Sequence, residues 1–246
     1  MLEILLIRHG QTDWNRDRRI MGRKDIPLNR AGKSEAKELA RALKGVAIDA
    51  IYTSPVLRAV ETARFLLDGR GGRVVHIDDM AEIDYGHWIG KTFEEVVPEK
   101  EFHVYHKTPR KACPPGGEPM CEVYERSVRF IEKIRKKHKR GRVAVVSHAD
   151  VIKTVLVHYL DMDLNDLLKF RIDNASISLL WFHKERRRVM AVNCLPRPAK
   201  LFGLRDLLSP GPFRRSPGPR GSASASRGTP GGVRRKGSKR SSGRRS

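Results

Sequence analysis

Residues 2–15 read LEILLIRHGQTDWN, an aliphatic run that ends abruptly at Arg8, His9 and Gly10. Only Glu3 interrupts the apolar part, a pattern typical of a strand that is buried on both faces of its sheet. Such strands occur mainly in sheets covered by helices on both sides, so the stretch predicts an α/β fold. It also predicts that the strand delivers an arginine and a histidine to one edge of the sheet.

As far as about residue 195, the sequence alternates between predicted strands and predicted helices. Apolar residues at helical spacing predict helices over 31–45, 56–67, 122–138 and 149–160. Short apolar runs predict strands over 49–55, 73–77 and 141–148, then a hairpin of 175–182 and 189–195 across the charged turn 184–188. The alternation predicts a mostly parallel sheet wrapped by helices on both faces, with an antiparallel portion at its end.

Charge and composition separate the C-terminal segment from the rest of the chain. The 246 residues carry a net charge of +22, and half of this excess lies in residues 209–246, which hold eleven lysines and arginines and no acidic residue. Glycine, serine and proline make up 22 of those 38 residues. Such a segment cannot bury enough apolar surface to offset the entropy lost on ordering. We therefore predict one domain over 1–208 and a disordered basic tail over 209–246.

The three cysteines, Cys113, Cys121 and Cys194, form no CxxC pair and have no zinc-like spacing to the histidines. An odd number of cysteines without such patterns favours a reduced, cytoplasmic protein. No apolar run approaches the ~20 residues of a membrane helix, and the N-terminal run is too short for a secretory signal. We therefore expect a mature cytoplasmic protein that starts at Met1.

Residues 86–120 show no sustained periodicity, and long irregular stretches in compact domains are usually functional or mobile. We interpret them as a lid over the site. The lid is basic, with Lys100, His103, His106, Lys107, Arg110 and Lys111. This charge suits a substrate with a second anionic group, and it agrees equally with the general basic character of the chain. His103 and His106 form an HxxH without a nearby carboxylate pair, and His87 is no better placed, so neither a metal site nor a cofactor is predicted.

Three junctions share one form, in which an apolar strand is followed by a polar turn with arginine or histidine and then by a helix. They are LLIRHG at 5–10, IYTSPVLRAVETA at 51–63 and VAVVSHAD at 143–150. Ligands bind open parallel sheets beyond the carboxyl ends of the strands. The pattern therefore predicts one pocket that contains Arg8, His9, Arg58 and His148. These four side chains form an anion site, to which helix N-termini would add backbone donors for a phosphate.

Four segments in order, LIRHGQTDWN, SPVLRAVETA, EIDYGHWIG and VVSHADVI, closely resemble the histidine phosphatase superfamily, also called the phosphoglycerate mutase-like family. The resemblance covers about Leu2 to Leu195 and implies a three-layer α/β/α sandwich, in agreement with the pattern of strands and helices. The element PGGEP around Glu118, followed by Arg126, resembles the shorter phosphatase branches, such as the α-ribazole and broad-specificity phosphatases. The same residues also fit a glycine-rich turn that enters a helix.

The resemblance implies a role for each residue of the predicted pocket. His9 matches the nucleophile that attacks phosphorus and forms a phosphohistidine, which water then hydrolyses. Gly10 lets the backbone come close enough to accept a hydrogen bond from the other ring nitrogen, which suits a neutral imidazole. Arg8, Arg58 and His148 match the clamp that holds the phosphoryl oxygens.

The leaving alkoxide needs a proton, and the resemblance implies that Glu82 supplies it. Such an acid needs a raised pKa, which burial under the lid would provide. Asp84 is the nearest competing carboxyl group, and its other interpretation is a solvated turn residue. Asn15 matches a phosphate ligand of the family, and Gln11 and Thr12 are further candidate donors from the same loop.

We therefore predict a metal-independent phosphomonoester hydrolase that acts on a small phosphorylated metabolite. The main alternative is a 2,3-bisphosphoglycerate-dependent phosphoglycerate mutase, which shares the His9 chemistry but keeps water from the phosphohistidine. Such mutases usually carry a long insertion after the acid, and the 25 residues from Lys91 to Pro115 do not contain one. An alternative of another class is polyanion or RNA binding by the basic tail, through counterion release. A solvated extension without a selected role also explains the tail.

Overall fold

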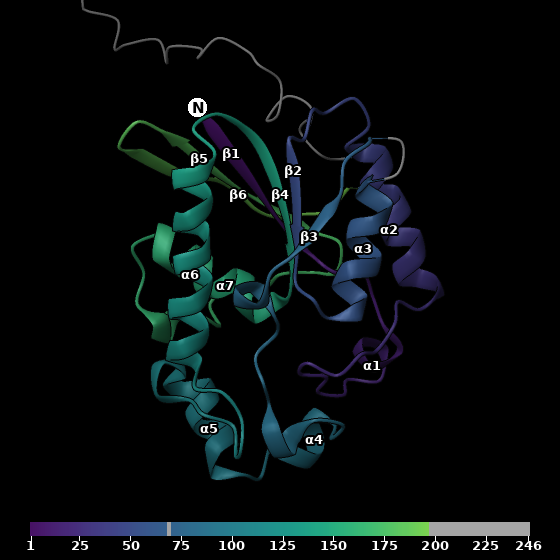
Figure 1. Cartoon of the computed structure of the whole chain (residues 1–246). Coiled ribbons are helices and arrows are strands. Elements are labelled where there is room, and N and C mark those ends of the chain that lie inside the picture. The colour runs from purple at the N-terminus through teal and green to yellow at the C-terminus, as the bar shows by residue number, and fades with distance from the viewer. Residues whose placement is uncertain (68–69, 197–246) are drawn as a thin grey trace, which may run out of the picture. The chain divides into compact units, whose positions relative to one another are not determined.

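The computed structural model describes residues 1–67 and 70–196. These residues form a central six-stranded sheet (Figure 1). The strands lie in the order β3-β2-β4-β1-β5-β6. Their bounds are β1 Leu2–Arg8, β2 Ala50–Thr53, β3 Val74–His76, β4 Gly141–Ser147, β5 Ile177–His183 and β6 Arg186–Cys194. The neighbours β3, β2, β4 and β1 are parallel, whereas β5 pairs antiparallel with both β1 and β6. The predicted mostly parallel sheet with an antiparallel end is confirmed.

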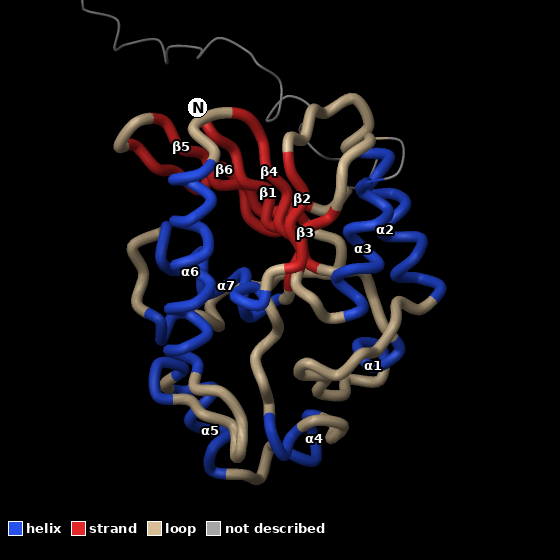
Figure 2. The backbone as a smooth tube through the Cα atoms, viewed as in Figure 1, coloured by secondary structure: helices blue, strands red, loops and turns tan. Residues whose placement is uncertain are grey.

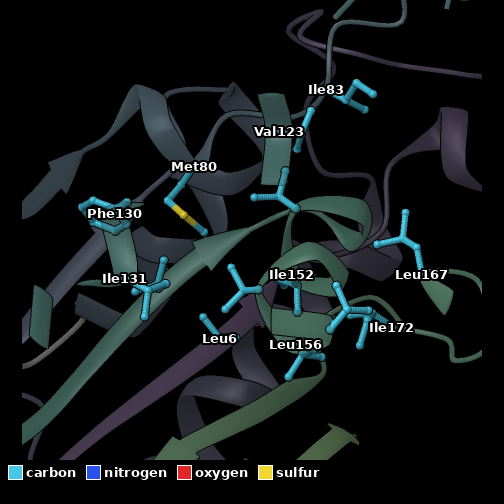
Figure 3. Packing of buried hydrophobic residues seen from close by; sticks show 14 of the residues in the cluster. Leu6, Met80, Ile83, Val123, Phe130, Ile131, Ile152, Leu156, Leu167 and Ile172 are labelled. Atoms are coloured by element: carbon cyan, nitrogen blue, oxygen red, sulfur yellow. The ribbon is translucent and has the colours of Figure 1, made fainter. Parts of the chain in front are cut away.

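Helices cover both faces of the sheet, which gives the three layers of an α/β/α sandwich. Figure 2 shows the red sheet between two groups of blue helices, namely α2 (Arg30–Ala42) with α3 (Leu57–Leu67), and α6 (Met120–Lys137) with α7 (Ala149–Tyr159). Alternate side chains of β1 point to opposite faces of the sheet. Leu5 and Ile7 pack with α2 and α3, whereas Ile4 and Leu6 pack with α6 and α7. Figure 3 shows Leu6 among the second set of side chains. The strand predicted to be buried on both faces therefore separates two hydrophobic cores.

The register of the sheet brings three strand ends together. Arg8 at the end of β1 lies opposite Ser147 at the end of β4, and Thr53 at the end of β2 lies opposite Val146. The residues that follow these three strands therefore emerge at one edge of the sheet. This is the edge at which open α/β sheets bind ligands and at which the sequence predicted the pocket.

Residues 86–120 are more regular than predicted. They contain α4 (Phe93–Val96), α5 (Lys100–Lys107) and 3-10 turns at Gly86–Trp88 and Pro109–Lys111. Thr92 begins α4 with a capping box, in which its hydroxyl accepts a hydrogen bond from the Glu95 N–H. Phe102 and Tyr105 anchor α5 by burial. The prediction of an irregular segment is wrong, because helices of one or two turns carry too little apolar periodicity to be recognised.

The predicted hairpin is present, but its turn is shorter than predicted. Only Lys184 and Glu185 separate β5 from β6, since Arg186 already pairs with His183 and Arg187 with Phe182. β6 is the edge strand of the sheet, where arginines can project into solvent without disturbing a core.

The predicted tail over 209–246 lies outside the described residues. In the part of the chain that the structure describes, no helix combines the length and apolar character needed to cross a membrane.

Candidate active site

His9 follows directly after β1 and is almost fully buried, with 1% exposure. Its Nδ1 lies 2.7 Å from the carbonyl oxygen of Gly10, which can only accept a hydrogen bond. Nδ1 therefore carries the proton, and Nε2 keeps a lone pair. Burial first, and then the charges of Arg58 and Arg8, hold the His9 pKa well below its usual value. The imidazole is neutral at pH 7, which is the form able to attack an electrophile.

The loop that carries His9 is fixed by close packing against the start of α2. The Gly10 N–H donates to the Thr62 hydroxyl at 3.0 Å. A Cβ atom on Gly32 would lie 2.0 Å from the carbonyl oxygen of Gln11, and one on Gly10 would lie 2.6 Å from that of Gly32. Both positions therefore require glycine, because the two backbone segments approach too closely for any side chain.

Arg58 lies in the first turn of α3 and is fully buried. Its Nε donates to His9 Nε2 over 3.1 Å, and its terminal nitrogens donate to the carbonyl oxygens of Lys24 and Gly22 at 3.0 and 2.8 Å. Burial lowers the Arg58 pKa to about 10, so the guanidinium stays cationic at neutral pH. A positive charge is thereby fixed against the lone pair of His9.

Arg8 and His148 each present a buried nitrogen that has no hydrogen-bond partner among the described residues. Arg8 is held by one bond from Nη1 to the Ile172 carbonyl oxygen at 2.8 Å, and its Nε is unpaired. His148 Nε2 lies 2.8 Å from the Ser54 hydroxyl, and its Nδ1 is unpaired. Buried polar atoms without partners are costly, so these two nitrogens indicate a place for a polar ligand.

Glu82 faces the same residues from the segment after β3. Its Oε2 lies 3.8 Å from Arg58 Nη2 and 3.6 Å from His148 Nδ1. Its Oε1 accepts a hydrogen bond from the Ile83 N–H at 3.1 Å. Burial, with the charge of Asp150 as the second cause, raises the Glu82 pKa to about 7. The carboxyl group therefore holds a proton over much of the neutral range, as a general acid requires.

The ion pair between Arg126 and Glu118 holds the backbone that carries Glu82, a structural role that the sequence did not predict. Arg126 of α6 donates to both carboxylate oxygens of Glu118, at 2.7 and 3.0 Å. The same guanidinium donates to the carbonyl oxygens of Asp79, Ala81 and Glu82 at 2.9, 2.7 and 3.3 Å. The PGGEP element at Glu118 was the available signal, but nothing in it indicated that its partner fixes the Glu82 segment.

A cavity of about 380 Å³ lies beside these residues. Arg8, Asn15 and Glu82 of the predicted site line it, together with Asn174, whose Nδ2 donates to the His9 carbonyl oxygen at 3.0 Å. Asn174 was not predicted, because it comes from the loop before β5 and carries no motif. The lid contributes Trp88, Phe102 and Tyr105 to an aromatic wall, which Tyr85 completes from the residue just before the lid.

Most basic residues of the lid do not line this cavity. Of the six that were predicted, all of them described, only His106 lines it. The side of α5 that faces inward is instead its apolar side, and Arg110 pairs with Asp163 at 3.0 Å. Positive charge in the lining comes mainly from other segments, through Arg18, Arg19, Lys153 and Arg171.

Asn15 lies in the cavity wall, but two other predicted ligands do not. Thr12 caps α1 (Asp13–Arg16): its buried hydroxyl accepts from the Asn15 N–H at 3.1 Å, and its own N–H donates to Asn15 Oδ1 at 3.0 Å. Gln11 accepts a hydrogen bond from the Asn29 side chain at 3.0 Å, outside the cavity. The side chains of Thr12 and Gln11 therefore support the loop in this structure, and their role as phosphate donors stays a prediction. Asp84 accepts from a backbone N–H in its own turn and does not line the cavity.

No group of three or more histidine, cysteine, aspartate or glutamate side chains within residues 1–67 and 70–196 is arranged to hold a metal ion. The ring of His106 packs against that of Phe102, with centroids 4.3 Å apart. The site is therefore built from two buried histidines, cationic side chains and one carboxyl group, that of Glu82, whose pKa is raised.

Comparison with known proteins finds similar sequences and structures along most of the chain. Residues 4–195 match the histidine phosphatase superfamily (branch 1). Phosphoserine phosphatase 1 of Hydrogenobacter thermophilus is 34% identical over 195 residues, which cover 78% of this chain and 92% of that protein. The structure of YhfR from Bacillus stearothermophilus aligns with a TM-score of 0.75 at 30% identity, over 79% of this chain and 98% of that one. A mutant phosphoserine phosphatase of Entamoeba histolytica in complex with phosphoserine aligns with a TM-score of 0.71 at 30% identity, over 78% and 97% of the two chains. This chain therefore belongs to the histidine phosphatase superfamily, in its branch 1.

Proposed function

We propose that the protein hydrolyses a small phosphomonoester in two steps, without a metal ion. In the first step, His9 Nε2 attacks phosphorus, the bond from phosphorus to the ester oxygen breaks, and the leaving oxygen takes the proton of Glu82. In the second step, water attacks phosphorus and gives a proton back to Glu82, the bond from phosphorus to His9 Nε2 breaks, and inorganic phosphate and the free imidazole result. The observation that carries the proposal is the neutral His9, whose Nδ1 is tied to the backbone while Nε2 contacts Arg58.

The surrounding charges support a phosphoryl group as the ligand. Arg58 and the unpaired nitrogens of Arg8 and His148 lie around the nucleophile, where they would bind the phosphoryl oxygens. Asn15 in the cavity wall would contribute a further donor. The cationic lining from other segments favours a substrate with a second anionic group, such as a carboxylate.

A phosphoglycerate mutase remains the competing activity, because it would use the same His9 chemistry. The lid favours hydrolysis, since its segment from Lys91 to Pro115 consists of two short helices and a turn without a long insertion. Phosphate transferred back to phosphoglycerate without net release would contradict hydrolysis.

The test is a panel of phosphorylated metabolites assayed for released phosphate, with and without 2,3-bisphosphoglycerate. His9→Ala should abolish release, and rapid acid-free quenching of the wild type should trap a phosphohistidine. His103→Ala is the matched control, because this histidine lies in α5 but does not line the cavity. Normal turnover of p-nitrophenyl phosphate by His9→Ala would overturn the proposal.

The basic tail stays a prediction in its two forms, a polyanion-binding segment or a solvated extension. A chain that ends at Leu208 should keep full hydrolytic activity. Salt-sensitive RNA binding that the full chain has and the shortened chain lacks would favour a separate binding function.

A further inference from the structure

Asp150 is a buried carboxylate that the proposed mechanism does not use. It lies in the first turn of α7, two residues after His148. Its Oδ2 accepts hydrogen bonds from the hydroxyls of Tyr85 and Tyr105, both at 2.5 Å, and its Oδ1 lies 3.2 Å from Lys153 Nζ. Both tyrosines belong to the cavity wall, and Tyr105 comes from α5 of the lid. One carboxylate on the sheet side therefore holds two aromatic side chains of the wall.

Asp150 also lies in the same cavity wall as Glu82. Two carboxyl groups in one poorly solvated site do not both ionise readily, so the environment of each decides which one keeps the proton. Burial opposes ionisation of Asp150, but Lys153 and the two tyrosine hydroxyls outweigh it and lower the Asp150 pKa. Among the described residues, the Glu82 carboxyl group receives one hydrogen bond, from the Ile83 N–H, and its pKa is raised by burial and then by Asp150.

Other charged and titratable groups also influence the protonation of Glu82 and Asp150. Basic and titratable groups from several elements face Glu82 or Asp150. They are Arg8 of β1, Arg58 of α3, Tyr85 before the lid, Tyr105 and His106 of the lid, Arg126 of α6, His148 just before α7 and Lys153 within it. The two arginines Arg58 and Arg8 lower the Glu82 pKa, so without an opposing negative charge they would favour its ionised form. Asp150 is the ionised carboxylate that opposes them.

We propose that Asp150 is a positioning residue with two effects, which are to hold Tyr85 and Tyr105 over the cavity and to keep the proton on Glu82. The proposal rests on the proposed function, in which Glu82 protonates the leaving oxygen. It assigns Asp150 no contact with the reacting atoms.

The test compares Asp150→Asn with Glu99→Gln. Asparagine keeps a carbonyl acceptor for the tyrosines but removes the charge. Glu99 is the matched control, because it also anchors the lid, through Trp88 Nε1 at 2.6 Å and Lys91 Nζ at 2.9 Å, yet does not line the cavity. We would measure kcat against pH on an alkyl phosphate, whose leaving group needs protonation. Asp150→Asn should move the alkaline fall of kcat about one pH unit lower, as expected for removal of a neighbouring like charge, whereas Glu99→Gln should not move it.

Asp150→Glu separates the two effects, because it keeps the charge and displaces the carboxylate: KM should rise while the alkaline fall stays near its wild-type position. Asp150→Ser removes the same charge with a smaller side chain and replaces Asp150→Asn if that variant does not fold. An unmoved profile in the charge-removing variant overturns the proposal, and so does an equal movement in Glu99→Gln, which would indicate loosening of the lid. An alkaline fall that persists in Glu82→Gln would contradict the proposed function instead, since it would show that Glu82 is not the acid.

Discussion

Arg58 donates a hydrogen bond from Nε to Nε2 of His9 over 3.1 Å, so the nucleophilic atom and a fixed cation are in direct contact. The other two guanidinium nitrogens are held by the carbonyl oxygens of Gly22 and Lys24, and no carboxylate of the described residues lies at hydrogen-bonding distance from them. Backbone carbonyls orient the charge and neutralise little of it. Arg58 can therefore stabilise negative charge on a phosphoryl group at the place where it develops.

Arg58→Lys should lower kcat/KM by about 100-fold, the usual loss for one donor aimed at transition-state charge. An ammonium group cannot contact His9 and both carbonyl oxygens in the planar fork that the guanidinium provides. Steady-state kinetics would measure the loss, with circular dichroism to confirm folding. Arg64→Lys, an exposed change in the same helix, should have no effect. Activity of Arg58→Lys within threefold of the wild type would contradict this role.

Where strong patterns were present, the sequence predicted the fold and the meeting of three strand ends at one edge of the sheet. The apolar run before Arg8 and the strand–turn–helix junctions before Arg58 and His148 follow from burial and topology, so their meeting at one edge of the sheet was predictable. Asn174 and Asp150 could not be found in this way. Their importance depends on contacts with His9 and Tyr105, and such pairings between distant segments leave no periodic signal.

The same limit explains why the local contacts of residues 11–12 were not predicted. Gln11 and Thr12 are polar loop residues beside a predicted nucleophile, so both fitted the role of phosphate donor. Their side chains are used locally instead, for Asn29 and for the cap of α1, because polar side chains in tight loops often satisfy nearby backbone groups.

The activity lost in Glu82→Gln should depend on how strongly the leaving group of the substrate needs a proton. With an alkyl phosphate, kcat should fall about 100-fold or more, the scale of general-acid catalysis. With p-nitrophenyl phosphate the loss should be much smaller, because that leaving group departs readily as an anion. In the wild type, kcat on the alkyl phosphate should fall above pH of about 7, where Glu82 loses its proton. Equal losses on both substrates would contradict the role as an acid.

Arg126→Met should destabilise the protein and misplace Glu82. The change leaves the mostly buried Glu118 carboxylate with Arg23 as its remaining cation and removes the donors to three carbonyl oxygens. Breaking a buried ion pair in this way costs about 3 kcal/mol. Urea unfolding would measure the free energy, and kcat should fall while KM changes little. Arg129→Met, which removes a more exposed ion pair to Asp79 from the same helix, should cost under about 1 kcal/mol.

Gly32→Ala tests whether close backbone packing positions the loop of the nucleophile. In an open helix, alanine is more favourable than glycine by about 1 kcal/mol. Here the new Cβ would lie 2.0 Å from the Gln11 carbonyl oxygen, so backbone must move, and we expect a net loss of about 2 kcal/mol, as for overpacked cores. The displaced segment lies next to Gly10, so kcat/KM should fall as well. Gly45→Ala is the control: its φ of +80° adds strain of about 1 kcal/mol, but its Cβ meets open space, so activity should be unchanged. A Gly32→Ala protein with wild-type stability and activity would show that the loop yields without affecting His9.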